Sequence, residues 1–273
     1  MEQMKEKNTQ VFLVLSDKSK DAVMLYEQIL QMGQGYGDIF LLYHQKTNLL
    51  PEEVQKRDHF IFTDTIITQS NYFPVGFSLV PGNVHYPVLQ FFLQNPNYDY
   101  YWCIEDDVRF SGDWTELFRA FDTIGSDFIT SHIRTSSEEP AWYWWHALAN
   151  PYQVIDFKDR IKSFNPIFRI SQAALAFIHD ALISGWCGHN EVLFPTLLFE
   201  AGFDITDFGG NGPFVRPGFE NKFYLEQEPN NPQTGTMRWR PVFDQTGKEK
   251  NKLYHPVKEK KFMIGPEISE KKA

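Results

Sequence analysis

Cysteine is scarce in this chain. Cys103 and Cys187 are the only two in 273 residues, and each lies inside an apolar or aromatic segment, YYWCI and SGWCG. A disulfide framework therefore has little support, and we expect two reduced, buried thiols.

Long hydrophobic runs are also missing. The first ten residues, MEQMKEKNTQ, contain no apolar run, and no later stretch approaches the roughly 20 apolar residues that a membrane span needs. We expect no transmembrane segment and a cytoplasmic location, with the inner membrane surface as the alternative.

Basic residues are outnumbered. The chain has 26 Lys and Arg against 35 Asp and Glu, a formal charge of −9, and its basic residues are thinly spread before the C-terminal tail. A phosphate-backbone partner such as nucleic acid is therefore not expected. An acidic enzyme whose anionic substrate arrives with a divalent metal still fits. The sequence does not define an oligomeric state.

Several catalytic signatures are absent. No GxGxxG follows the first predicted strand, and there is no P-loop lysine, GxSxG elbow or CxxC pair. Dehydrogenase, kinase, hydrolase and zinc-module interpretations thus lack their usual residues. Gly33, Gly35 and Gly37 follow a predicted helix and precede a strand, so they indicate a connection.

What the chain does contain is an alternation of strands and helices. Short apolar runs alternate with segments of helical periodicity, with strands at 11–15, 39–43, 59–62 and 98–104 and helices at 21–32 and 84–94. This order predicts an α/β fold with a mostly parallel central sheet flanked by helices. Ligands of such sheets bind at the carboxyl ends of the strands.

The second part of the sequence is less regular. We expect a strand at 127–131, a short apolar element at 173–179, a helix at 191–201, and long ordered loops from Gly209 onward. The predicted organisation is one domain, 8–265, followed by a flexible tail, 266–273. Its nucleotide-binding half is 10–110 and its loop-rich acceptor-binding half is 111–260.

Three consecutive carboxylates give the strongest functional signal. Glu105, Asp106 and Asp107 end the aromatic, β-rich run NYDYYWCI. Three charges cannot enter a sheet interior unpaired, so they should emerge where the strand meets a cleft. Oxygen ligands of this kind suit Mg²⁺ or Mn²⁺ holding a diphosphate. The alternative is an acidic helix turn or a surface loop capped by Asp113.

The segment YDYYWCIEDDVRFSGDW resembles the DXD region of the nucleotide-sugar-dependent glycosyltransferases of the GT-A fold, in a variant written EDD. The resemblance covers roughly residues 10–260 and is specific only in three short segments. It implies that Asp107 is a direct ligand of Mn²⁺ or Mg²⁺. It also implies that Glu105 and Asp106 contact the ribose, the donor sugar or a metal-bound water.

The second similar segment, SGWCGHNEVLFPT, looks like the part of this fold that approaches the acceptor. By that resemblance Glu191 is the general base of an inverting enzyme, for which a partly desolvated carboxylate is suited. The alternative is that Glu191 only caps its helix. His189 would bind the acceptor or orient Glu191, or would be a structural residue.

The third segment, LYHPVK, is similar to the closing segment of many GT-A enzymes. The resemblance implies that His255 is a metal ligand and that Lys258 stabilises the departing diphosphate. A solvated basic tail is the alternative, because further lysines lie nearby.

Two other groups are candidates for ligand binding. The run AWYWWH, 141–146, predicts that Trp142 or Trp145 is exposed as a platform for a sugar ring, with core packing as the alternative. Ser16 and Asp17 follow the first strand, where a nucleotide base or ribose often binds in this architecture.

The sequence is therefore interpreted as a metal-dependent glycosyltransferase. It would move a sugar from a nucleotide-sugar donor to a carbohydrate or other hydroxyl acceptor, with inversion. A nucleotidyltransferase or metal-dependent phosphohydrolase would use the same acidic cluster on phosphorus. A non-catalytic carbohydrate-binding protein would use the aromatic surface and need neither metal nor nucleotide.

Overall fold

The computed structural model describes residues 9–31, 36–228, 231 and 233–258. The predicted tail, 266–273, and two of the three connecting glycines, Gly33 and Gly35, lie outside the described residues.

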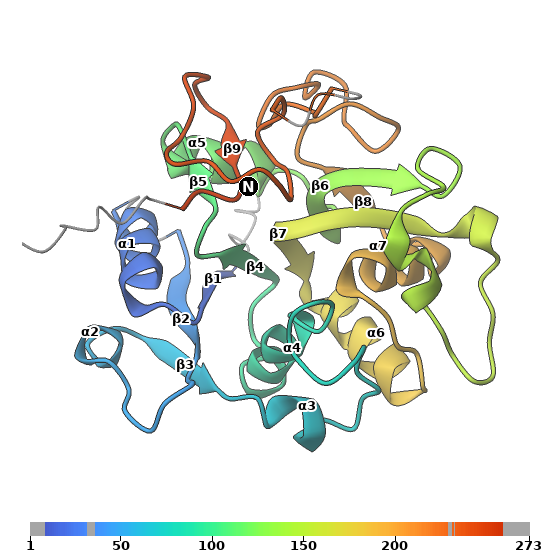
Figure 1. Ribbon diagram of the computed structural model, residues 1–273, viewed down its shortest axis with the longest axis horizontal. Helices are drawn as coiled ribbons and strands as arrows, with labels where there is room; N and C mark the ends of the chain where they lie inside the picture. Colours follow the sequence, from blue (N-terminus) through green and yellow to red (C-terminus); the bar gives the residue numbers. More distant parts are fainter. Residues whose placement is uncertain (1–8, 32–35, 229–230, 232, 259–273) are drawn as a thin grey trace, which may run out of the picture.

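A seven-stranded sheet forms the centre of the fold, in the order β3-β2-β1-β4-β7-β6-β8 (Figure 1). Strands β3, β2, β1 and β4 are mutually parallel, β7 is antiparallel to both of its neighbours, and β8 is parallel to β6. The predicted α/β class with a mostly parallel sheet is confirmed. The strands are β1 (Gln10–Ser16), β2 (Asp38–His44), β3 (His59–Phe62), β4 (Tyr100–Glu105), β6 (Phe128–Thr135), β7 (Ile161–Ser171) and β8 (Ile205–Asp207).

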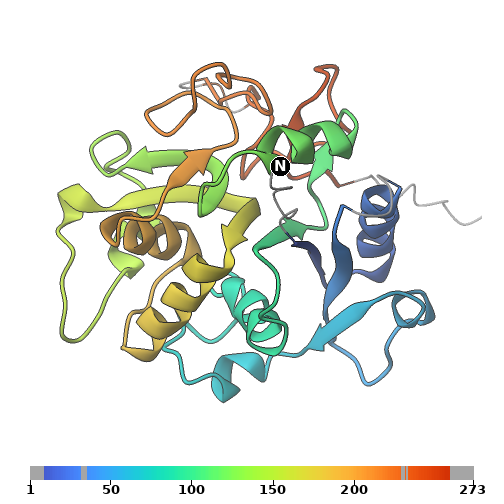
Figure 2. The same cartoon turned by 180° about the vertical axis from the view of Figure 1, so that it is seen from behind.

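Helices cover both faces of this sheet (Figures 1 and 2). Residues of α1 and α5 share one hydrophobic core, and residues of α3, α4, α6 and α7 share the other. The helices are α1 (Ser19–Leu30), α2 (Glu52–Gln55), α3 (Ile66–Gln69), α4 (His85–Gln94), α5 (Trp114–Asp122), α6 (Gln172–Ile183) and α7 (Asn190–Glu200), with short 3₁₀ turns η1 (Tyr143–Ala147) and η2 (Phe157–Asp159).

The first strand shows why the alternation predicted this layering. Val11 and Leu13 pack in the core beneath α4 and α6, whereas Phe12 and Val14 pack in the core beneath α1 and α5. A strand buried on both faces has no polar side, so its sequence is a continuous apolar run. Cys103 in β4 is likewise buried, Cys187 is partly exposed, and both are free thiols.

Several elements have no counterpart in the sequence-based expectations, and the longest of them are strand β7 and helix α5. Strand β7 reads IKSFNPIFRIS, and its polar residues and proline hide its β pattern, although nearly all of its side chains are buried. Helix α5 begins directly after Asp113, whose carboxylate accepts a hydrogen bond from the Thr115 amide at 2.8 Å. The apolar element expected at 173–179 is part of helix α6.

The chain beyond Gly209 is mostly irregular, as expected, and returns to the sheet at its end. There β9 (Leu253–Tyr254) pairs antiparallel with β5 (Arg109–Phe110), directly after the acidic triplet. This pairing brings the C-terminal segment to the carboxyl end of β4. Among the described residues, no helix combines the length and apolar character needed to cross a bilayer.

Candidate functional site

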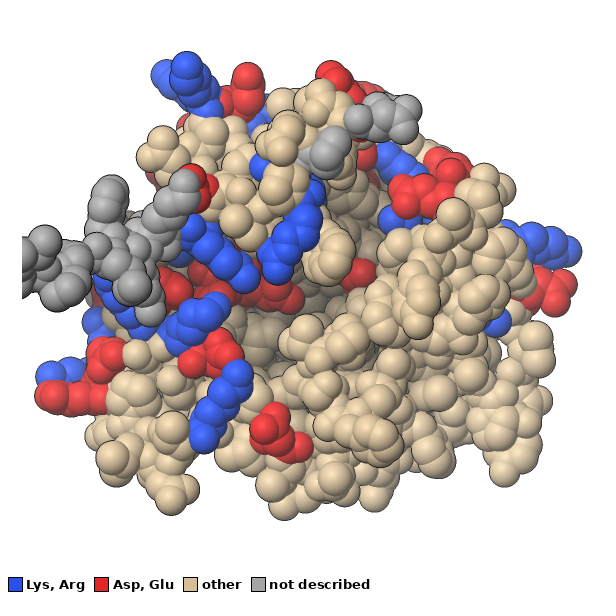
Figure 3. All heavy atoms as spheres, viewed as in Figure 1, with Lys and Arg blue, Asp and Glu red and all other residues tan. Residues whose placement is uncertain are grey.

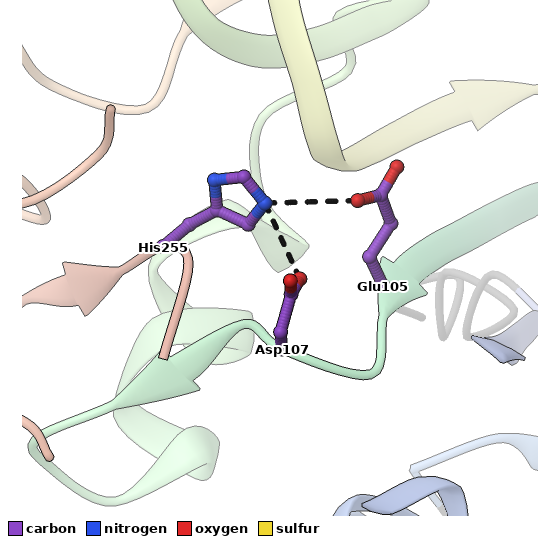
Figure 4. A group of neighbouring side chains, drawn as sticks. All are labelled: Glu105, Asp107 and His255. Carbon is purple, nitrogen blue, oxygen red and sulfur yellow. Dashed lines mark ion pairs between the residues drawn. The ribbon is translucent and has the colours of Figure 1, made fainter. Parts of the chain in front are cut away.

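The acidic triplet and the C-terminal histidine meet at one point. Glu105 is the last residue of β4, Asp107 lies in the following turn, and His255 follows β9 (Figure 4). The Val257 amide donates to the Asp107 carbonyl at 2.8 Å, so the C-terminal segment is bonded to the triplet's own backbone. Figure 4 shows the three side chains pointing toward one another.

The ligand atoms of these residues form a compact group. Nε2 of His255 lies 3.2 Å from Oδ1 of Asp107 and 3.6 Å from Oε2 of Glu105. One ligand atom from each residue can be chosen such that all lie within 4.8 Å of one another. Lys258 joins from the rim, with Nζ 3.4 Å from Oδ2 of Asp107.

The charges within this group stabilise one another. Burial opposes the charge on His255, but hydrogen bonding and attraction to Asp107 and Glu105 outweigh it and raise its pKa to about 9. Burial also opposes the charge on Asp107, but His255 and then Lys258 lower its pKa to about 2. Without a metal ion, the protonated imidazole therefore partly neutralises the two carboxylates.

These residues fit a divalent cation. Oδ1 of Asp107 is buried and accepts no well-formed hydrogen bond, although it lies within ion-pair distance of His255. Nδ1 of His255 faces the Arg238 carbonyl at 3.0 Å, so Nε2 is the atom directed at the carboxylates. Two carboxylates and an imidazole are ligands that Mn²⁺ accepts readily.

A half-buried polar network holds the segment that positions His255. The His255 amide donates to the Thr236 carbonyl at 2.9 Å, and the Arg238 amide donates to the His255 carbonyl at 3.1 Å. Between these residues, the Met237 carbonyl lies 2.8 Å from Nε2 of His132, whose Nδ1 lies 3.0 Å from Oε2 of Glu226. His132 thus links strand β6 to the segment at 236–238, which in turn bonds to the backbone of His255.

A cavity of about 420 Å³ opens beside the triplet. Figure 3 shows this region as a hollow in which acidic side chains gather, with basic side chains on its rim. Its lining combines apolar side chains with charged and polar ones. Its lining includes Leu15, Ser16, Asp17, Lys18, His44, Lys46, Phe62, Asp64, Leu79, Val80, Glu105, Asp106 and Asp107. A second hollow of about 600 Å³, between α5 and the C-terminal segment, contains none of the triplet.

Ser16 and Asp17 lie in the first cavity, but both are already engaged. The Ser16 hydroxyl donates to the Asp106 carboxylate, and Lys18 lies 3.5 Å from the same carboxylate. Asp17 forms an ion pair with Lys46. Asp106 is therefore tied to the end of β1 rather than to the metal candidate, and its pKa is raised, chiefly by burial.

Glu191 stands in the first turn of α7, near the triplet but outside the cavity lining. Its Oε1 lies 3.4 Å from the Asn165 amide of β7, and its side chain is 17% exposed. Burial raises its pKa to about 7, although Lys162 opposes this rise; Glu105 adds to it and His255 opposes it. Glu105 and His255 are thus near enough to influence its charge.

The cap of helix α7 is His189, not Glu191. Nδ1 of His189 accepts a hydrogen bond from the Glu191 amide at 3.2 Å, so the imidazole fills the capping position. Burial lowers the pKa of His189 to about 4, which keeps Nδ1 an acceptor at neutral pH. The carboxylate of Glu191 stays close to this cap, with Oε2 3.7 Å from Nδ1 of His189.

The aromatic run divides into buried and accessible rings. Trp145 is fully buried, and its indole N–H donates to the Glu139 carbonyl at 2.8 Å, so the expectation that it could be an exposed sugar platform is wrong. The Trp145 ring is instead part of the hydrophobic core, where it packs against the rings of Trp142 and Phe157. Trp142 is partly exposed, and its ring lies 6.0 Å from that of His189.

Sequence reasoning missed three lysines and an asparagine. Lys18 and Lys46 line the cavity, and Lys18 directly follows the residues already singled out, so its position was a usable signal. Lys162 and Asn165 reach Glu191 from β7, the strand that the sequence pattern did not reveal.

Comparisons with known proteins add little about activity. A family profile described as "Protein of unknown function (DUF3405)" is similar to residues 46–165, which is less than half of the chain. No curated protein shows detectable sequence similarity to it.

One solved structure with an overlapping architecture is described as a putative glucose-1-phosphate thymidylyltransferase from Bacillus anthracis in complex with a sucrose. It is 9% identical, and the superposition covers 75% of this chain and 87% of that chain with a TM-score of 0.40. A similarity this low does not establish a shared fold or activity.

Proposed function

We propose that the chain is a metal-dependent glycosyltransferase that moves a sugar from a nucleotide-sugar donor to an acceptor hydroxyl with inversion. Asp107, His255 and Glu105 would hold Mn²⁺ or Mg²⁺, and a bound cation would neutralise the donor's diphosphate. The 420 Å³ cavity, whose lining includes Ser16, Asp17 and Asp106, would receive the nucleotide.

The observation that supports this proposal is that a candidate diphosphate-binding site and a candidate general base lie close together. A mixed carboxylate and imidazole cluster adjoins a cavity rimmed by lysines, and a carboxylate with a pKa of about 7 stands near the same cluster. Diphosphate binding uses the cluster and the lysines, and proton removal from a hydroxyl uses the carboxylate.

The chain's own groups would divide the chemistry as follows. Glu191 accepts the proton of the acceptor hydroxyl as its oxygen bonds to the anomeric carbon. The bond from that carbon to the diphosphate oxygen breaks, and its electron pair leaves with the nucleoside diphosphate. Lys258, on the open side of Asp107, offsets the charge that develops there.

A thermal-shift screen of nucleoside diphosphates with and without Mn²⁺ tests the donor site. A ligand at a hundredfold excess over its dissociation constant adds about 2.7 kcal/mol to the free energy of unfolding. We expect one nucleotide to raise Tm only with metal, and Asp107→Asn to abolish the rise. Asp180→Asn, an exposed aspartate on α6, is the control and should keep it.

The products distinguish this proposal from phosphorus chemistry. With the donor identified, a glycosyltransferase forms a new glycosidic bond and depends on Glu191. Formation of a nucleotide–sugar bond, or donor cleavage at phosphorus that Glu191→Gln leaves unchanged, would contradict the proposal. Absence of any nucleotide-dependent shift would also refute it.

A further inference from the structure

Three segments beside the candidate active site contain no charged residues. Residues 65–98, 140–155 and 181–190 contain no Asp, Glu, Lys or Arg, although such residues make up 22% of the chain. We call these three segments together the uncharged face. They include α3, α4, η1 and the connection between α6 and α7.

The three segments adjoin one another. Tyr72 Oη lies 2.6 Å from Nδ1 of His179 on α6, and the Asn190 amide donates to the Gly82 carbonyl at 3.0 Å. An antiparallel bridge joins Ala149 to Cys187. In Figure 3 the surface below and to the right of the hollow is a broad area almost free of basic and acidic side chains.

The uncharged face reaches the candidate site at two places. Leu79 and Val80 line the 420 Å³ cavity. On the other side, the ring of Trp144 lies 4.8 Å from that of His189, which caps the helix carrying Glu191. A molecule lying on this face would therefore extend to the candidate base.

Large aromatic side chains project from the uncharged face. Phe73 is 61% exposed, Phe77 is fully exposed, Tyr143 is 78% exposed and Tyr152 is 88% exposed. Single exposed rings are ordinary on protein surfaces. Several exposed rings on adjoining segments, one of them Tyr143 next to Trp144, indicate a ligand surface.

This combination matches one class of ligand. Sugar rings pack their C–H faces on aromatic rings, and their hydroxyl groups bond to uncharged polar groups such as the serine and asparagine side chains of these segments. The three segments themselves contain no lysine or arginine that could bind a carboxylate, sulfate or phosphate. Lys162, whose Nζ lies 5.4 Å from the centre of the Trp142 ring, is already paired with Glu139 at 2.6 Å. An anionic lipid surface would also need such cations.

We infer that the acceptor is an uncharged oligosaccharide that binds along the uncharged face with its reacting hydroxyl at Glu191. The transfer step rests on the proposed function, whereas oligosaccharide binding does not require it. Binding should be insensitive to salt, because no ion pair contributes.

Binding is tested with the full chain in the absence of donor. Neutral oligosaccharides, namely gluco-, xylo-, manno- and chito-oligomers of two to six sugars, are compared with oligogalacturonates and heparin fragments by titration calorimetry. We expect at least one neutral series to bind, more tightly with increasing length. No anionic series should bind.

Variants locate the binding surface. Tyr143→Ala and Phe77→Ala should each weaken oligosaccharide binding about three- to tenfold, the loss of one ring contact. Trp239→Ala is the matched control, since this 76% exposed ring lies outside the uncharged face between two arginines, and should leave affinity unchanged.

The outcomes separate the two proposals. Oligosaccharide binding without any metal-dependent nucleotide binding would refute the transferase and leave the saccharide surface. Nucleotide binding with acceptors that are all anionic, or association with phosphatidylcholine vesicles in place of saccharides, would overturn the inference about the acceptor. Unchanged affinity in both ring variants would overturn it too.

Discussion

At the scale of single residues, the local environment gives the carboxylates of the candidate site different pKa values and therefore suits them to different roles. Asp107 stays ionised because His255 and Lys258 offset its burial, whereas Glu191 holds its proton up to about pH 7 because burial dominates. Asp106 is bonded to Ser16 and Lys18. A general base needs a proton affinity near the working pH, and the pKa of Glu191 meets this condition whereas that of Asp107 does not.

Glu191→Gln is expected to lower the transfer rate by about a hundredfold or more, because the amide cannot accept the hydroxyl proton. In the wild type, the rate should rise as Glu191 loses its proton, and level off above about pH 7. Steady-state kinetics from pH 5 to 9 measures both effects. A variant with the wild-type pH profile would contradict the assignment of Glu191 as base.

The same substitution should affect stability in the opposite direction. The folded pKa of Glu191, about 7, lies above its usual value of 4.5, so the charged form disfavours folding at high pH. The cost is absent below about pH 4.5 and complete above about pH 7, where it approaches about 3 kcal/mol. Urea denaturation should show Glu191→Gln to be more stable than wild type at pH 8 and equally stable near pH 4.

At the scale of elements, the C-terminal segment that carries His255 forms only short strand pairings, and a side-chain network helps to hold it in position. β9 has two residues, and the segment at 236–238 forms only isolated backbone bridges. Glu226 connects to β6 through His132 and through Arg134, whose Nη2 lies 2.7 Å from Oε1. Burial alone would raise the pKa of Glu226, but His132 and then Arg134 lower it to about 2.

Glu226→Gln should therefore destabilise the protein in a pH-dependent way. A carboxylate whose folded pKa is depressed from 4.5 to about 2 contributes its stabilisation above about pH 4.5 and loses it as the pH falls toward 2. We expect a loss of about 3 kcal/mol at pH 7, shrinking through that range. Urea denaturation at several pH values gives the difference.

The exposed neighbour Glu228 provides the control for this measurement. Glu228→Gln should change the free energy of unfolding little at any pH. An equal effect of the two substitutions would show that the His132 contact does not hold the segment.

The same scale shows where element prediction failed. Strands β1, β2 and β3 and helices α4 and α7 were predicted within about two residues because their apolar spacing repeats regularly. Strand β7 was not, since its buried Lys162, Asn165 and Arg169 find partners that only the folded chain supplies. Arg169, for example, donates to the Phe121 carbonyl at 2.7 Å from the middle of the sheet.

At the scale of the whole molecule, the candidate metal group joins distant parts of the chain. Glu105 and Asp107 end a strand of the parallel half, and His255 arrives at the other end of the described chain. A cation held by all three would cross-link these parts and add a constraint that the two-residue β9 cannot provide.

Hydrogen exchange measured by mass spectrometry should detect this cross-link. With Mn²⁺ added, the amides of residues 253–255 and 257 should exchange more slowly, because their opening would require release of the metal. Peptides from α2, which contacts α1 and lies away from the candidate metal group (Figure 1), serve as the internal reference and should not change. Equal exchange with and without Mn²⁺ would mean that His255 does not bind the ion.

The sequence by itself determined the α/β class, the order of the early strands and the position of the acidic triplet, because these follow from local periodicity and from the cost of burying charge. Only the tertiary structure decided that Glu105 lies with Asp107 and His255, that Asp106 turns to Ser16, and that Trp145 is core. Such distinctions depend on tertiary contacts between residues that are far apart in the sequence, and local sequence patterns do not contain information about those contacts.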